Sequence, residues 1–123
     1  MPYHITLRRW FSAAHQLRLG DGSLEPLHGH NWQVRVVVER EDSGLDDIGT
    51  VHDFHDVERR LDALLAGLHN THLNETAAFS EVNPTTEHVA GHLARALPLP
   101  TGLRVAEVEV RETPDCSATW KRQ

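Results

Sequence analysis

The fold is decided by residues 27–38, which read LHGHNWQVRVVV. Within this stretch every second residue from Trp32 to Val38 is apolar, and Gln33 and Arg35 fall between them. Alternation with a period of two is typical of a β-strand that buries one face. We therefore predict a strand over about residues 30–40.

The segments on both sides of this strand supply three more. Residues 3–14 alternate in the same way, and a polar loop over residues 16–27, rich in glycine, serine and proline, joins the two. Near the other end, residues 105–110 and 117–122 predict two strands around a turn at Thr113-Pro114-Asp115. Two such hairpins can form one antiparallel sheet.

Two helices are predicted between the hairpins. Asp53 is a candidate N-cap for a helix that runs to about residue 68, since leucines recur there at helical spacing. Asn83-Pro84-Thr85 begins a second helix, which Pro98 ends. The order ββααββ predicts an α+β fold, as a single domain over residues 1–123, with both helices on one face of the sheet. The open edges of the end strands favour assembly with other copies of the chain.

The composition is that of a globular protein, with 39% hydrophobic and 24% charged residues. The net charge of −6 argues against nucleic acid or an acidic membrane as a partner. No stretch approaches the roughly 20 apolar residues of a membrane span, and the N-terminus has no apolar signal-peptide core. With Cys116 as the only cysteine, we expect a reducing, cytoplasmic setting. Nearly all the positive charge is arginine, whose forked guanidinium suits carboxylate or phosphate.

The best local signal for chemistry is His28-Gly29-His30 at the start of the central strand. Side chains two residues apart on a strand point the same way, so both imidazoles can reach one metal ion. His15 ends the first strand, and antiparallel pairing would bring it beside them. Three neutral histidines with an open fourth position are typical of catalytic zinc. The alternative is that these histidines are only hydrogen-bonded or solvated, since the motif is short.

Three carboxylates accompany the histidines. Glu25 lies in the loop that carries the candidate ligands, three residues before His28. Asp53 could orient a ligand histidine, although its role as a helix cap is at least as well supported. Glu112 ends a strand, where a lone glutamate is usually exposed, so its position alone assigns it no function.

The chain resembles the 6-pyruvoyltetrahydropterin synthase and 6-carboxytetrahydropterin synthase family. The matching motifs follow in order over nearly the whole chain: Phe11-Ser-Ala-Ala-His15, His28-Gly-His30-Asn31, Asp53-Phe54, Leu73-Asn74-Glu75, Asn83-Pro-Thr-Thr-Glu87 and Val110-Arg-Glu112-Thr113. The resemblance implies a tunnelling fold, in which trimers close their sheets into a barrel and commonly stack as hexamers. It also implies active sites between subunits.

The resemblance further implies a substrate, a metal and site residues. The substrate would be 7,8-dihydroneopterin triphosphate or a close pterin, and Zn²⁺ held by His15, His28 and His30 would acidify its side-chain hydroxyls. The pterin-anchoring glutamate of the family falls on Glu112, and the threonines that help hold the ring fall on Thr85 and Thr86.

Two positions depart from the family pattern. The usual catalytic cysteine before His-Gly-His is absent, and residues 22–27 read GSLEPL. Glu25 instead fits a Glu-x-x-His-Gly-His variant that is associated with side-chain cleavage to 6-hydroxymethyl-7,8-dihydropterin, with glutamate as the base. The family's Asp-His pair falls on His69 and Asn70, so the histidine comes one residue early and loses its aspartate. Glu107, Glu109 or Asp56 are candidate replacements for that aspartate.

Two hypotheses follow. The first is a zinc-dependent lyase acting on a dihydropterin, with Glu25 as base, His69 as a proton shuttle and Glu112 as ring anchor. The second is a homologue that binds zinc and a pterin but lacks the usual synthase activity.

Overall fold

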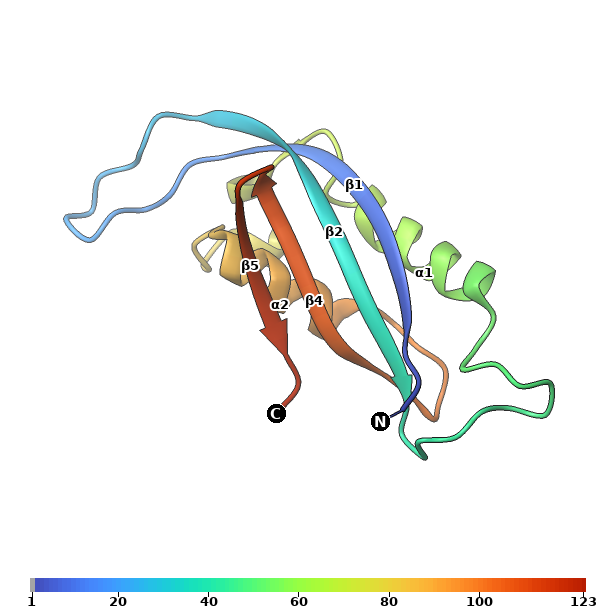
Figure 1. Ribbon diagram of the computed structural model, residues 1–123. Coiled ribbons are helices and arrows are strands. Elements are labelled where there is room, and N and C mark those ends of the chain that lie inside the picture. The colour runs from blue at the N-terminus through green and yellow to red at the C-terminus, as the bar shows by residue number, and fades with distance from the viewer. Residues whose placement is uncertain (1) are drawn as a thin grey trace.

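The computed structural model describes residues 2–123 and has a five-stranded sheet in the order β3-β1-β2-β4-β5 (Figure 1). The strands are β1 (Ile5–His15), β2 (His28–Arg40), β3 (Thr71–His72), β4 (Leu103–Thr113) and β5 (Cys116–Lys121). The helices are α1 (Phe54–Ala66) and α2 (Thr86–Ala96), with short 3-10 turns at Leu73–Glu75 and Ala77–Phe79. The predicted α+β class and ββααββ order are therefore confirmed.

The sheet is mixed rather than wholly antiparallel. The four long strands pair in antiparallel fashion as predicted, but the two residues of β3 lie parallel to β1 beside Ala13 and Ala14. The chain reaches this position through Asn70, whose left-handed backbone (φ 59°) turns it back toward the sheet after α1. A two-residue strand carries no alternation, so the sequence pattern could not show it.

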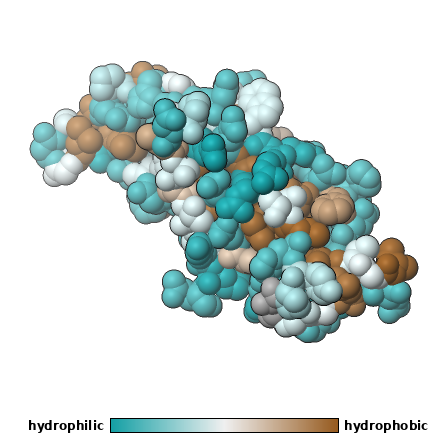
Figure 2. Space-filling view, viewed as in Figure 1, coloured by the Kyte–Doolittle hydropathy of each residue, from teal (hydrophilic) through white to brown (hydrophobic). Residues whose placement is uncertain are grey.

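Both helices cover the same face of the sheet and leave the other face open. Phe11, Trp32, Val36 and Val108 point to the helix side and are almost fully buried. Val57, Leu61 and Leu65 of α1 and Val89, Ala90 and Leu93 of α2 complete this core. Figure 2 looks onto the open face, where the strands carry mainly hydrophilic side chains. Neither helix is long and apolar enough to span a membrane, nor is any other helix within residues 2–123.

The helices begin where capping chemistry predicts. The Asp53 carboxylate accepts the backbone N–H of His55, and the Thr85 hydroxyl accepts that of His88. Helix α1 ends at Ala66, slightly earlier than predicted, and α2 ends before Pro98. The start of α2 is the more important of the two for the site, because the N-terminus of α2 adjoins the histidine cluster described below.

Glu39 is a buried carboxylate near the far end of β2. It accepts hydrogen bonds from Arg104 (Nε to Oε2, 2.7 Å) and from His4 (Nε2 to Oε1, 3.2 Å). Burial alone would raise the pKa of Glu39, but the hydrogen bond and charge of Arg104, with help from His4, outweigh it and hold the pKa below its usual value. The ionised form therefore stabilises the fold at neutral pH.

Glu39→Gln is expected to lower the free energy of unfolding by about 2 kcal/mol at pH 7, because the hydrogen bonds to charge are lost. A depressed carboxyl pKa gives stability that is present at neutral pH and lost as pH falls through the folded-state value. The difference from the parent protein should therefore shrink toward pH 3. Urea unfolding at both pH values measures it, with exposed Glu41→Gln as the control. An equal difference at pH 7 and pH 3 would contradict the role of the charge.

Candidate metal centre

The candidate metal centre is built where β1 ends and β2 begins. His15 lies directly opposite His28 in the antiparallel register, and His30 lies opposite Ala13. Because β2 begins at His28, two residues earlier than predicted, both histidines belong to the strand and share its helix-side face with His15. Glu112, near the end of β4, points to the same place. The predicted convergence of the three imidazoles is therefore present.

The four side chains form one tight group. His15 Nε2 lies 3.1 Å from His28 Nε2 and 3.1 Å from Glu112 Oε1, and His30 Nε2 lies 3.6 Å from the same carboxylate oxygen. One donor atom from each of the four residues lies within 4.8 Å of every other. This spacing lets a single ion contact all of them, since zinc binds imidazole nitrogen at about 2.1 Å.

Backbone carbonyls fix the orientation of two of the rings. His15 Nδ1 donates to Pro84 O at 2.8 Å, and His28 Nδ1 donates to Pro26 O at 2.9 Å. Because a carbonyl only accepts, the proton of each neutral ring is on Nδ1 and the Nε2 lone pair is free. The two lone pairs then face each other at 3.1 Å, an arrangement that a shared cation stabilises. Such a carbonyl partner is typical of metal-binding histidines.

His30 completes the group from a partly buried position. Its Nε2 is buried and has no hydrogen-bond partner within residues 2–123. Burial lowers the pKa of His30, despite the nearby Glu112 carboxylate, and so favours the neutral ring. Trp32 packs edge-on against His15 and His30, with ring centroids 4.8 and 5.4 Å away, and its indole N–H donates to Ala13 O. The residues present therefore fit a zinc ion by donor type, tautomer and spacing.

Glu25 lies beside the histidine cluster, near His28. Its Oε1 accepts the backbone N–H of Leu17 at 3.0 Å and lies 3.8 Å from His28 Nε2. The loop that carries it is tied down by two asparagines: Asn74 accepts from Gln16 N, and Asn83 accepts from Arg18 N. A carboxylate is thus held beside the histidines by a fixed loop, where a base could act.

The start of α2 borders the same region. Pro84 is buried and gives its carbonyl to His15, and the two threonines that follow are partly exposed. Thr85 already accepts the N–H of His88 as the helix cap, which leaves its hydroxyl proton free to donate. Thr85 and Thr86 are therefore both available to a ligand at this end of the sheet.

His69 lies apart from the group. It is exposed, accepts the backbone N–H of Ser12 on Nδ1 at 3.0 Å, and meets the Trp10 ring edge-on at 5.7 Å. Ser12 and Trp10 point to the open face of the sheet, opposite to His15. Within residues 2–123 no ion pair joins His69 to a carboxylate.

The carboxylates suggested as partners for His69 are engaged elsewhere. Asp56 pairs with His52 and Arg60, and Glu107 and Glu109 pair with Arg35. Asp53 is likewise occupied as a helix cap, and the carbonyls of Pro26 and Pro84 orient the ligand histidines instead.

A family model described as 6-pyruvoyl tetrahydropterin synthase matches residues 4–123. The chain belongs to that family. Its tunnelling fold is shared with the Caenorhabditis elegans 6-pyruvoyl tetrahydropterin synthase structure, at a TM-score of 0.78 and 24% identity over 98% of this chain and 97% of that one. As a member of the family, the chain is a pterin synthase or lyase.

Two relatives of the chain by sequence are named for different activities. A putative 6-carboxy-5,6,7,8-tetrahydropterin synthase of Archaeoglobus fulgidus is 32% identical over 91% of this chain and 90% of its own length. A dihydroneopterin monophosphate aldolase of Pyrococcus furiosus is 34% identical over 73% of this chain and 70% of its own length. The family membership therefore leaves the reaction open between synthase and aldolase chemistry.

Proposed function

We propose that the protein is a zinc-dependent lyase that cleaves the side chain of a 7,8-dihydroneopterin phosphate. The observation that carries this is the histidine cluster, with a glutamate rather than a cysteine held 3.8 Å from His28 Nε2. His15, His28 and His30 would hold the zinc, which, when bound, lowers the pKa of side-chain hydroxyls by Lewis-acid polarisation. The similarity to a named aldolase is compatible with cleavage, and the absence of a cysteine from residues 22–27 favours cleavage over the synthase reactions.

Glu25 is proposed as the base. Its carboxylate takes the proton of the second side-chain hydroxyl, the carbon–carbon bond between the first and second side-chain carbons breaks, and the electron pair moves toward the pterin ring. An aldehyde leaves, and the same proton returns to the ring-side carbon. The products are 6-hydroxymethyl-7,8-dihydropterin, which keeps the first side-chain carbon, and a two-carbon aldehyde that carries the phosphate, so all atoms are accounted for.

Glu112, Thr85 and Thr86 are proposed to hold the pterin. A carboxylate can accept two hydrogen bonds from adjacent ring and amino N–H groups, which fixes the orientation of the ring. Glu112 Oε1 lies 3.1 Å from His15 Nε2, so the ring anchor and the metal ligands share one wall of the site. Sequence reasoning did not find this contact.

We also propose that the working site lies between subunits of a trimer or hexamer, as the family resemblance implies. His69 is exposed on the open side and lies away from the histidines of its own chain, so it would serve as a proton shuttle only in a neighbouring subunit's site.

Incubation of the zinc-loaded protein with 7,8-dihydroneopterin triphosphate and, separately, with the monophosphate tests the function. We expect 6-hydroxymethyl-7,8-dihydropterin from at least one of them by liquid chromatography and mass spectrometry. Release of triphosphate with a pyruvoyl or carboxy product would show synthase chemistry instead. Tight pterin binding without any product would favour the second candidate, a zinc- and pterin-binding homologue without the synthase activity, which the missing cysteine and the isolated His69 support.

Glu112→Gln is expected to weaken pterin binding about 10- to 100-fold. The ring's two N–H groups need two acceptor oxygens, and the amide replaces one of them with an N–H donor. Zinc content should stay near one per chain, since three histidines remain. Fluorescence titration with a pterin and metal analysis of the same sample measure both. Loss of zinc with the substitution would instead make Glu112 a fourth ligand of the metal.

A further inference from the structure

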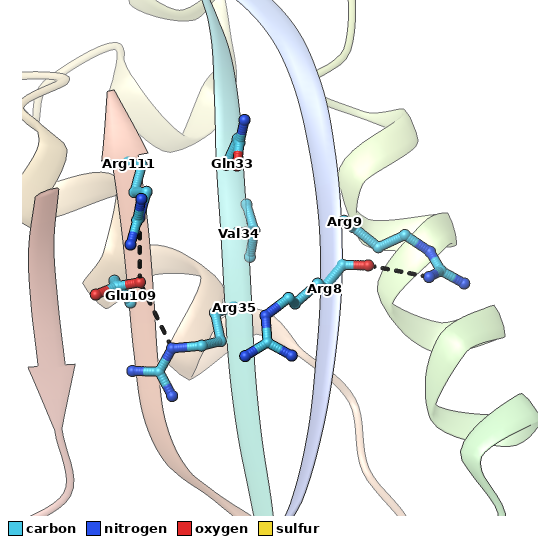
Figure 3. Close-up of a pocket in the computed structure, with 7 residues that line it drawn as sticks. All are labelled: Arg8, Arg9, Gln33, Val34, Arg35, Glu109 and Arg111. Carbon is cyan, nitrogen blue, oxygen red and sulfur yellow. Dashed lines mark hydrogen bonds and ion pairs between the residues drawn. The ribbon is translucent and has the colours of Figure 1, made fainter. Parts of the chain in front are cut away.

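The open face of the sheet carries a hollow of about 420 Å³ that the proposed reaction does not use. Figure 3 shows the arginines that define it: Arg8 on β1, Arg35 on β2 and Arg111 on β4. Gln33 lies on β2 directly opposite Arg111 and two residues before Arg35. The volume is within the range in which proteins bind small ligands. We call this feature the arginine hollow.

The charges in the arginine hollow do not balance. Arg35 is paired with Glu107 and, at 3.5 Å, with Glu109, and Arg111 lies 3.6 Å from that same Glu109 oxygen. Arg8 has no hydrogen bond or ion pair from its guanidinium among residues 2–123. Two carboxylates therefore face three guanidinium groups, and Lys121 already shares Glu107 at 3.8 Å.

The register places two like charges opposite each other on this face. Arg8 lies directly opposite Arg35 across β1 and β2, and like charges in that relation destabilise a sheet. Arg9, the neighbour on β1, also borders the hollow, but its side chain extends toward α1 (Figure 3). There Glu58 and Asp62 neutralise it. The chain as a whole carries a net charge of −6, so the positive charge here is local.

We propose that the arginine hollow binds a phosphate or polyphosphate anion. Guanidinium groups present parallel N–H donors that match phosphate oxygens, and the Gln33 amide adds a neutral donor. Within residues 2–123, Arg8 supplies an unpaired charge, and Arg111 supplies a second charge that shares the Glu109 carboxylate with Arg35. Arg35 lies on the strand between them. An anion between the three strands removes the repulsion of Arg8 and Arg35.

This site is distinct from the metal centre. Arg8, Arg35 and Arg111 alternate along their strands with Leu7, Val36 and Val110, which face the helices. Glu112 follows Arg111 and points to the opposite face, toward His15. Binding in the arginine hollow therefore does not depend on zinc or on turnover, and the proposal stands or falls separately from the proposed function.

Isothermal titration of the zinc-loaded protein with inorganic triphosphate tests the proposal. Arg8→Gln and Arg111→Gln are each expected to weaken binding at least 10-fold, while zinc content and pterin affinity stay unchanged. Arg8→Lys, which keeps the charge but not the fork, should fall between Arg8→Gln and the parent. The matched control is Arg59→Gln, because Arg59 is an exposed arginine on α1 whose loss changes the net charge equally.

Three outcomes would overturn the proposal. The first is no heat of binding for the parent protein. The second is that Arg8→Gln and Arg59→Gln weaken triphosphate binding equally, which would mean that triphosphate is attracted to positive charge in general rather than to this site. The third is that Arg8→Gln changes the size of the assembly, as measured by light scattering, but leaves triphosphate affinity unchanged. That result would mean that Arg8 contacts another subunit.

Discussion

Replacing His28 by alanine is expected to lower the affinity for zinc by more than about 100-fold. His28 is one of three imidazoles whose Nε2 atoms converge, and its ring is fixed by the hydrogen bond from Nδ1 to Pro26 O. Changes to the outer partners of a metal site already cost about 10- to 100-fold in affinity, so the loss of a ligand should cost more. Zinc competition with a chromophoric chelator measures the change.

His55→Ala provides the control for this experiment. His55 is largely exposed on α1 and pairs with Glu58, so its removal deletes an imidazole without touching the cluster. We expect its zinc affinity to equal that of the parent. Equal zinc affinity in His28→Ala and the parent would show that the three histidines do not hold the metal.

The histidine cluster was largely predictable because its assembly depends on local rules. His28 and His30 share a face by the period of a strand, and pairing of two sequential strands through one loop brings His15 to them. The same rules gave the helix starts, since Asp53 and Thr85 are residue types that accept a backbone N–H. Each of these inferences needed only short-range sequence information.

The parts that sequence reasoning missed depend on long-range register. Glu112 meets His15 because β4 pairs with β2 in one particular alignment, which no local pattern fixes. The Pro84 carbonyl that orients His15 comes from a helix start 69 residues away. The family resemblance assigned Glu112 a role but did not predict its contact with His15. The sequence also did not predict that His69 lies on the opposite face of the sheet.

The chemistry of the site follows from what orients the ligands. Backbone carbonyls accept the Nδ1 protons of the His15 and His28 rings, so these second partners would bring no negative charge to a bound metal. In the proposed function, a zinc ion held by the three imidazoles alone would keep its full charge to polarise a substrate oxygen. The nearby carboxylates of Glu25 and Glu112 would then serve the proposed proton transfer and ring recognition.

Glu25→Gln is expected to reduce kcat by about 10²- to 10⁴-fold, the usual contribution of a positioned general base. The amide oxygen can still accept the N–H of Leu17, so the loop should keep its shape. Zinc content and pterin affinity should therefore stay within about twofold of the parent, because only the proton acceptor is lost. Product formation under saturating 7,8-dihydroneopterin phosphate, with metal analysis of the same sample, measures this.

The matched control is Glu81→Gln, at an exposed glutamate outside the histidine cluster. We expect its kcat to equal that of the parent. A Glu25→Gln protein that binds zinc and pterin normally and turns over at the parent rate would remove Glu25 as the base. Loss of zinc in this variant would instead show that the carboxylate supports the metal through His28, 3.8 Å away, and the proton acceptor would then have to be another group.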